Sequence, residues 1–216
     1  MRVVVGKPYL RTPIFSSKIT EIEFNPYWNV PTSIAVKDIL QKILGDSDYL
    51  RKEHIKVFSR GSERAPEINP ESIDWSQVDT ENFPFRLRQD PGPLNALGRI
   101  KFIFPNKYDV YLHDTPAREL FKRPQRDFSH GCIRIEKPIE LAEYLLKNDP
   151  QWTQEEIRTA ISDTRTRIVQ LPEPIPIHVL YLTAWVDGEG RINFRDDIYK
   201  RDMIVAQTLD QEPPAP

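Results

Sequence analysis

The stretch that decides the fold is Lys101-Phe-Ile-Phe-Pro-Asn-Lys-Tyr-Asp-Val-Tyr-Leu-His113, in which two apolar runs are separated by a turn signal. Residues 101–104 and 109–113 have the composition of β-strands, and Pro105-Asn106 between them favours a reversal of the chain. The stretch therefore predicts a β-hairpin. His113 ends its second strand, where a neighbouring element can bring another side chain against the imidazole.

β-Structure is also predicted at both ends of the chain. Strand-like runs occur near the start at Val3-Val4-Val5 and Ile19-Thr-Glu-Ile-Glu-Phe24, and near the end at residues 177–186 and Arg191-Ile-Asn-Phe194. Between the two β-rich parts, residues 31–84 are charged and mostly helical in pattern. Their first helix is predicted from apolar residues on one helical face, namely Val36, Ile39, Leu40, Ile43 and Leu44.

Helices are predicted again after the hairpin. Residues 138–148 carry apolar positions at helical spacing, and Thr153-Gln-Glu-Glu156 is a capping box that opens another helix. We therefore expect a mainly β fold with helices. Its parts are a β-sandwich-like core of residues 1–30 and 85–205, an inserted subdomain of residues 31–84, and a flexible tail of residues 206–216.

Composition excludes several classes of protein. The 30 basic and 32 acidic residues leave a net charge of −2 without long single-sign blocks, so neither nucleic acid nor an anionic membrane surface is implied. No apolar run approaches the roughly 20 residues of a membrane-spanning helix, and residues 1–15 lack a signal-peptide layout. One cysteine and four scattered histidines allow no intramolecular disulfide and argue against a structural zinc site. No cofactor is called for.

The residues that carry chemistry are Ser129-His130-Gly131-Cys132, together with His113. A free thiol has a pKa of about 8.5, so a neighbouring base helps it to attack a carbonyl at neutral pH. Gly131 lets the backbone bend, and the amides of Gly131 and Cys132 could then face a developing oxyanion. Loss of one such donor typically costs about 3 kcal/mol of activation free energy.

Spacing distinguishes the two histidines. In an extended chain, His130 and Cys132 point the same way about 7 Å apart, too far for direct proton transfer. His113 is therefore the candidate base, and His130 a residue that organises the loop. On these residues alone, the alternative is an unreactive buried cysteine beside two surface histidines.

The pattern His-x15-Ser-His-Gly-Cys closely resembles the signature of the L,D-transpeptidase catalytic domain, also called the YkuD domain. Further strings are similar to the large, lid-bearing Gram-negative branch of that family. They are Asn25-Pro-Tyr-Trp-Asn-Val-Pro31, Phe85-Arg-Leu-Arg-Gln-Asp-Pro-Gly-Pro93, Asn95-Ala-Leu-Gly-Arg-Ile-Lys-Phe102, Tyr111-Leu-His-Asp-Thr-Pro116 and Thr183-Ala-Trp-Val-Asp187.

The resemblance implies a cysteine acyltransferase that acts on peptidoglycan stem peptides, both as donor and as acceptor. Such enzymes cleave a tetrapeptide stem after its third residue, form a thioester on the cysteine, release D-alanine and make a 3→3 cross-link. They use no metal, and β-lactams of the carbapenem class inhibit them. A periplasmic location is implied by the resemblance alone.

The resemblance also assigns residues. Cys132 matches the nucleophile and His113 the base, with oxyanion donors at Gly131 and Cys132 and loop support from Ser129 and His130. The expected substrate-binding residues are Tyr111, Arg134 and Trp28. Many members carry Asn where Arg134 stands, and Trp28 can equally be core packing.

Residues 31–84 correspond to a capping lid in that branch, which keeps water from a thioester until the acceptor amine arrives. One rival function is an L,D-carboxypeptidase or cross-link hydrolase on the same donor. The other is a non-catalytic wall-binding module, against which the Cys132–His113 pair argues. Larger members carry upstream modules, so these 216 residues are either part of such a protein or a short member.

Overall fold

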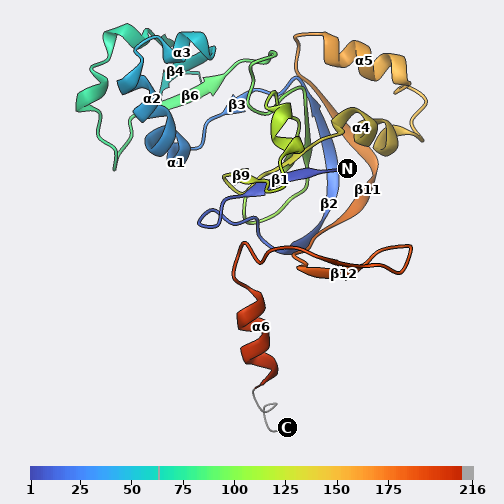
Figure 1. The fold of residues 1–216 in the computed structure, drawn as a ribbon. Coiled ribbons are helices and arrows are strands. Elements are labelled where there is room, and N and C mark those ends of the chain that lie inside the picture. Colours follow the sequence, from blue (N-terminus) through green and yellow to red (C-terminus); the bar gives the residue numbers. More distant parts are fainter. Residues whose placement is uncertain (63, 211–216) are drawn as a thin grey trace.

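The computed structural model describes residues 1–62 and 64–210 (Figure 1). It is a mainly β fold with helices, as predicted. A curved core sheet carries a smaller subdomain, which we call the lid after the expectation above, at one side and two helices at the other, while the last helix projects away from the core. Among the described residues, no helix combines the length and apolar character needed to cross a lipid bilayer.

The core sheet has seven strands of mixed direction. In spatial order they are β11 (Arg167–Val179), β2 (Phe15–Phe24), β7 (Ile100–Ile103), β8 (Leu112–His113), β10 (Ile133–Ile135), β1 (Val3–Gly6) and β9 (Asp127–Ser129). The β8–β10 and β1–β9 pairs are parallel, and the other pairs are antiparallel.

One hydrophobic cluster fills the core. It joins apolar side chains of the sheet to the inner faces of α4 (Pro138–Leu146) and α5 (Gln154–Ser162). The predicted capping box of α5 is present, because Thr153 Oγ1 accepts a hydrogen bond from the Glu156 amide at 3.2 Å. Trp152 stacks on Phe24 with ring centroids 5.1 Å apart, which joins the start of α5 to β2.

The predicted hairpin is confirmed, with its first strand shifted by one residue and its second strand shorter than expected. Lys101 pairs with His113 and Phe102 with Leu112. The chain between the strands leaves the sheet, and Asn106 closes this loop: its amide donates to the Phe104 and Val110 carbonyls at 2.7 and 2.8 Å. The histidine is thus held at the very end of the β7–β8 pair.

The lid has its own sheet and its own hydrophobic cluster, separate from that of the core. The sheet order is β3 (Trp28–Asn29), β6 (Phe85–Gln89), β4 (Ile55–Ser59) and β5 (Glu67–Ile68). Its helical elements are α1 (Thr32–Ile34), the π-helix η1 (Ala35–Ile39), α2 (Leu40–Gly45), α3 (Tyr49–Lys52), and the 3₁₀ helices η2 (Pro70–Ser72) and η3 (Trp75–Gln77).

Two sequence expectations for the lid need correction. The strands β3 and β6 were expected in the core, but they pair with each other in the lid sheet, where β6 also pairs with β4 and buries Leu87 in the lid cluster. The apolar face of the first helix is as expected at Ile39, Leu40 and Ile43, which are buried, but it does not extend to the end of the helix. Ala35 is buried, whereas Leu44, expected on the inner face, is 51% exposed.

The end of the chain differs from the expectation as well. After β11, the strands β12 (Ala184–Val186) and β13 (Ile192–Phe194) form a separate hairpin, and α6 (Asp202–Leu209) follows. Residues 206–209 of the expected flexible tail therefore belong to a helix, and residues 211–216 lie outside the described part. The remaining short helix, η4 (Arg118–Lys122), lies between β8 and β9.

Asn25 links the end of β2 to the end of α5 through buried hydrogen bonds, and its substitution tests what this link contributes to stability. It is fully buried with a φ of 47°, and its side-chain amide donates to the carbonyls of Ala160 and Asp163 at 2.7 and 2.6 Å. We expect Asn25→Ala to lower the free energy of unfolding by about 2–4 kcal/mol, because buried carbonyls lose partners and the left-handed backbone is disfavoured. Urea unfolding measures this. Asn82→Ala, at an exposed lid position, is the control, and an equal effect of both would contradict the prediction.

Candidate active site

The pairing of β8 with β10 brings four functional side chains together. Ile133 lies opposite Leu112 and Arg134 opposite His113 in a parallel register. Because side chains alternate along a strand, the buried pair Leu112 and Ile133 faces the core cluster, and the neighbouring positions face the other way. Cys132 and Tyr111, one step along the same register, join His113 and Arg134 on that face. All four line one cleft.

The cleft has a volume of about 840 Å³ and lies between the core and the lid. Among the residues expected at the site, those that line it are Trp28, Tyr111, His113, Ser129, His130, Cys132 and Arg134. Trp28 both lines the cleft and packs against the lid cluster. The structure thus gathers residues that are more than 100 positions apart in the sequence.

The loop before the nucleophile is stabilised by hydrogen bonds between its own residues. Ser129 Oγ donates to the Cys132 carbonyl at 2.6 Å and accepts from the Gly131 amide at 3.0 Å. The Gly131 amide is therefore already engaged and does not face an oxyanion in this conformation, which corrects the expectation for that donor. The Cys132 amide has no hydrogen-bond partner in the described part of the chain, so it remains the available donor.

Residues that sequence reasoning did not single out connect this loop to the rest of the core. Thr12 Oγ1 donates to the Gly131 carbonyl at 2.9 Å and accepts from the Gly6 amide at 2.9 Å. The buried Tyr199 hydroxyl donates to the Gly6 carbonyl at 2.7 Å. A Cβ on Gly6 would lie 2.0 Å from the Leu10 carbonyl, so this approach needs glycine. No sequence pattern marks Thr12 or Tyr199.

His113 is buried, at 5% exposure, and its tautomer is set by the backbone. Nδ1 lies 2.5 Å from the Asp114 carbonyl, so Nδ1 carries the proton and Nε2 is the nitrogen that can accept one. Burial lowers the pKa of His113 to about 3, and the charges of Arg134 and Lys101 add to this effect. The imidazole is therefore neutral near pH 7, which is the form a general base requires.

Asp114 fixes the backbone beside the imidazole. Its carboxylate accepts from the Arg99 amide at 2.9 Å and pairs with Arg118 at 3.1 Å. A Cβ on Gly98 would lie 2.3 Å from the same carboxylate, and Gly98 has a φ of +63°. A larger residue cannot take that place without displacing Asp114.

Cys132 is half-buried, and burial raises the pKa of its thiol. The backbone amide and hydroxyl of Tyr111 both face the sulfur and favour the thiolate, so they oppose that rise. Sγ also lies 3.8 Å from the Asp109 carbonyl, where a thiol proton can be directed. At rest the cleft holds a neutral thiol and a neutral imidazole, and attack on a carbonyl requires proton transfer from the thiol to a base.

Two cations flank this pair. Arg134 has its pKa lowered by burial, and its buried Nε has no hydrogen-bond partner among the described residues. Lys101 lies 4.7 Å from the centre of the Tyr111 ring and pairs with Glu23 at 3.2 Å. Sequence reasoning placed Lys101 in a strand and gave it no role at the site. In the structure it lies opposite His113 in the hairpin, so both side chains are on the same face of the sheet.

His130 turns toward the lid. Its Nε2 lies 2.6 Å from Asp38 Oδ2, across the cleft on the π-helix η1. Asp38 was not singled out by the sequence, because the two residues are 92 positions apart and no local pattern links them. The imidazole of His130 is thus engaged by the lid.

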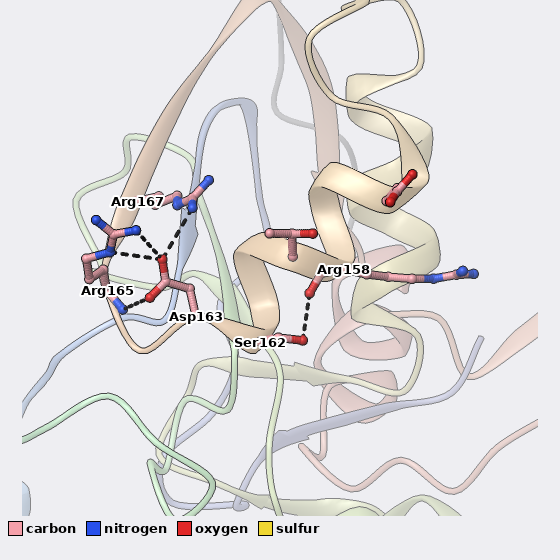
Figure 2. Close-up of a pocket in the computed structure, with 7 residues that line it drawn as sticks. Arg158, Ser162, Asp163, Arg165 and Arg167 are labelled. Atoms are coloured by element: carbon pink, nitrogen blue, oxygen red, sulfur yellow. Dashed lines mark hydrogen bonds and ion pairs between the residues drawn. The ribbon is translucent and has the colours of Figure 1, made fainter.

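A second hollow lies on the outer side of the core, at the end of α5. Figure 2 shows that Arg165 and Arg167 both reach Asp163 there, at 2.9 and 3.3 Å. Arg165 and Arg167 are paired with Asp163, the Ser162 hydroxyl donates to the Arg158 carbonyl at 2.9 Å, and neither a cysteine nor a histidine lines the hollow, so it offers no thiol–imidazole pair. In the described residues, no group of three or more His, Cys, Asp or Glu side chains has an arrangement suited to a metal ion.

The sequence of the chain matches a known family and a known protein. The family described as "L,D-transpeptidase catalytic domain" (YkuD) matches residues 1–158. A Haemophilus influenzae protein named "Putative L,D-transpeptidase" is 36% identical over 204 residues. That match covers 94% of this chain and 40% of the relative, so the chain spans well under half of the relative's length.

The buried neutral imidazole predicts a pH dependence of stability. In the unfolded chain, His113 takes up a proton below about pH 6.5, whereas in the folded protein it stays neutral until about pH 3. Stability should therefore fall as pH falls through this window, by up to about 1.4 kcal/mol per pH unit. Urea unfolding of wild type and His113→Gln between pH 4 and 7.5 tests this. The variant should lose this slope, whereas the exposed control His178→Gln should keep it.

Proposed function

The chain belongs to the L,D-transpeptidase catalytic domain family, and we propose that it forms 3→3 cross-links between peptidoglycan stem peptides through a Cys132 thioester. The observation that supports this most directly is the β8–β10 register. It places a thiol, a neutral imidazole and a cation on the same face of the sheet, in one cleft. This proposed substrate implies a periplasmic site of action.

In the proposed acylation step, His113 Nε2 takes the thiol proton while Sγ attacks the carbonyl of the third residue of a tetrapeptide stem. The Cys132 amide faces the developing oxyanion. The C–N bond to the terminal D-alanine then breaks, and the amine leaves with the proton from His113. The product is a thioester on Sγ, and no metal or cofactor takes part in the step.

In the proposed transfer step, the side-chain amine of a second stem attacks the thioester carbonyl. His113 takes a proton from this amine, the C–S bond breaks and the sulfur recovers the proton. The new amide is the cross-link. Water is the competing acceptor, and its attack would give a shortened stem with a free carboxylate, which is the hydrolase alternative.

We propose that Arg134 binds a carboxylate of the donor stem. Its guanidinium is half-buried and lies beside His113 in the register, with Nε unpaired. A bound carboxylate would offset one of the charges that lower the pKa of His113, so the donor would strengthen its own base. Trp28 and Tyr111 form walls of the same cleft and are the proposed contacts for the apolar parts of the stem.

The thiol assignment predicts a defined adduct. Incubation with a carbapenem should add one inhibitor mass to the wild-type chain and none to Cys132→Ser, because the serine hydroxyl is a far weaker nucleophile beside the same base. Intact-mass spectrometry measures this. The same instrument, applied to products from tetrapeptide muropeptides, separates cross-linked dimer from shortened stem. An equal adduct on Cys132→Ser would overturn the assignment.

The two histidines should behave differently. His113→Ala should slow carbapenem acylation about 10²–10⁴-fold, the range for loss of a positioned general base. His130→Ala should slow it less, because His130 is engaged by Asp38 rather than by the thiol. Stopped-flow acylation from pH 4 to 9 measures both. Wild type should show no inflection near pH 6.5, since the pKa of His113 is depressed. The reverse order of the two variants would exchange their roles.

A further inference from the structure

The lid is joined to the core by polar contacts on one side of the cleft. The buried Gln89 amide donates to the carbonyls of Glu53 in the lid and Leu94 in the core, at 2.8 and 2.9 Å. The buried Asn95 amide donates to the Pro26 and Asp90 carbonyls at 2.9 and 3.0 Å. Among the described residues each part has its own hydrophobic cluster, so the contacts named here join the two parts through polar groups.

On the nucleophile's side of the cleft, the lid and the core are in contact through two ionisable side chains that are partly exposed. Asp38 Oδ2 lies 2.6 Å from His130 Nε2, and both side chains are about one-third exposed, at 35% and 31%. The two atoms are within ion-pair distance, although Asp38 Oδ2 makes no hydrogen bond among the described residues, so the contact is an electrostatic one that needs a protonated ring to be an ion pair. Hydration does not cancel such a contact, although it weakens it.

Asp38 reaches the loop from an irregular helical turn. It lies in the π-helix η1, where Asp38 lines the cleft while the next residue, Ile39, packs in the lid cluster. Irregular helical turns of this kind recur at functional sites. In a continuous α-helix, the side chains would be rotated relative to these positions.

We propose that Asp38 is a positioning residue that holds the lid to the nucleophile loop through His130, and so keeps the lid over the thioester until the acceptor amine attacks. This inference rests on the proposed transferase function. The contact acts on the loop two residues before Cys132, whereas the Cys132 carbonyl is held by Ser129 Oγ and its sulfur faces Tyr111. Loss of Asp38 should therefore affect the fate of the thioester more than its formation.

The test compares Asp38→Ala, Asp38→Asn, His130→Gln and the double variant Asp38→Ala/His130→Gln with wild type. Asp48→Asn is the matched control, because Asp48 is a lid carboxylate that pairs with Arg51 on the exposed surface. Tetrapeptide muropeptides serve as donor and acceptor. The readouts are the ratio of cross-linked to hydrolysed product, the rate of carbapenem acylation, and amide hydrogen exchange over residues 32–45 and 129–132.

For Asp38→Ala, we expect the ratio of cross-linked to hydrolysed product to fall about 2- to 5-fold, the size of a partly exposed charged contact. Acylation should stay near wild type, and exchange should rise in both segments. Asp38→Asn should lie between. The double variant should be no worse than His130→Gln alone, since one contact is lost in each case. Asp48→Asn should match wild type.

An unchanged product ratio in Asp38→Ala, or additive effects in the double variant, would overturn the proposal. If Asp38→Ala does not fold, Asp38→Asn decides, because it keeps the size of the side chain. Wild type that makes neither product nor carbapenem adduct would refute the proposed function instead. Hydrogen exchange would then still decide whether Asp38 holds the lid to the loop.

Discussion

The site depends on the parallel pairing of two short strands, β8 and β10. One register step places Tyr111 and His113 beside Cys132 and Arg134, and a slip by one residue would turn all four into the core and expose Leu112 and Ile133 instead. Two residues on one strand are too few to hold such a register alone. The surrounding contacts supply the rest, because Asp114 anchors the end of β8 and Thr12 anchors the loop that leads into β10.

Burial determines the resting state of the chemistry. It is the largest influence on both partners, and it disfavours the imidazolium of His113 and the thiolate of Cys132 alike. Arg134 and Lys101 act on the two groups in opposite directions, since a cation favours the thiolate and disfavours the imidazolium. In a preformed thiolate–imidazolium pair, these two cations would therefore stabilise the thiolate and destabilise the imidazolium. The neutral pair is the state that burial selects, and charge separation belongs to the step in which the carbonyl is attacked.

Local patterns in the sequence predicted what depends on neighbours in the chain. The β7–β8 hairpin and the capping box at Thr153 were found because turn and capping residues act over a few positions. Alternation along residues 85–89 correctly indicated a strand, but it carries no information about which sheet that strand joins. The Asp38–His130 contact and the support from Tyr199 link residues 92 or more positions apart, and no periodicity records them.

The nucleophile loop, residues 129–132, makes some contacts within the core and one contact with the lid. This division bears on the proposed transfer reaction. Ser129 ties the loop to itself and Thr12 ties it to the core, so both contacts persist wherever the lid lies. His130 reaches the lid instead. Movement of the lid would release the loop on that side only, and it would leave the sulfur, the free Cys132 amide and the imidazole in place. The reacting groups can thus stay organised while the cover over them opens for a second peptide, as the proposed transfer between two peptide stems requires.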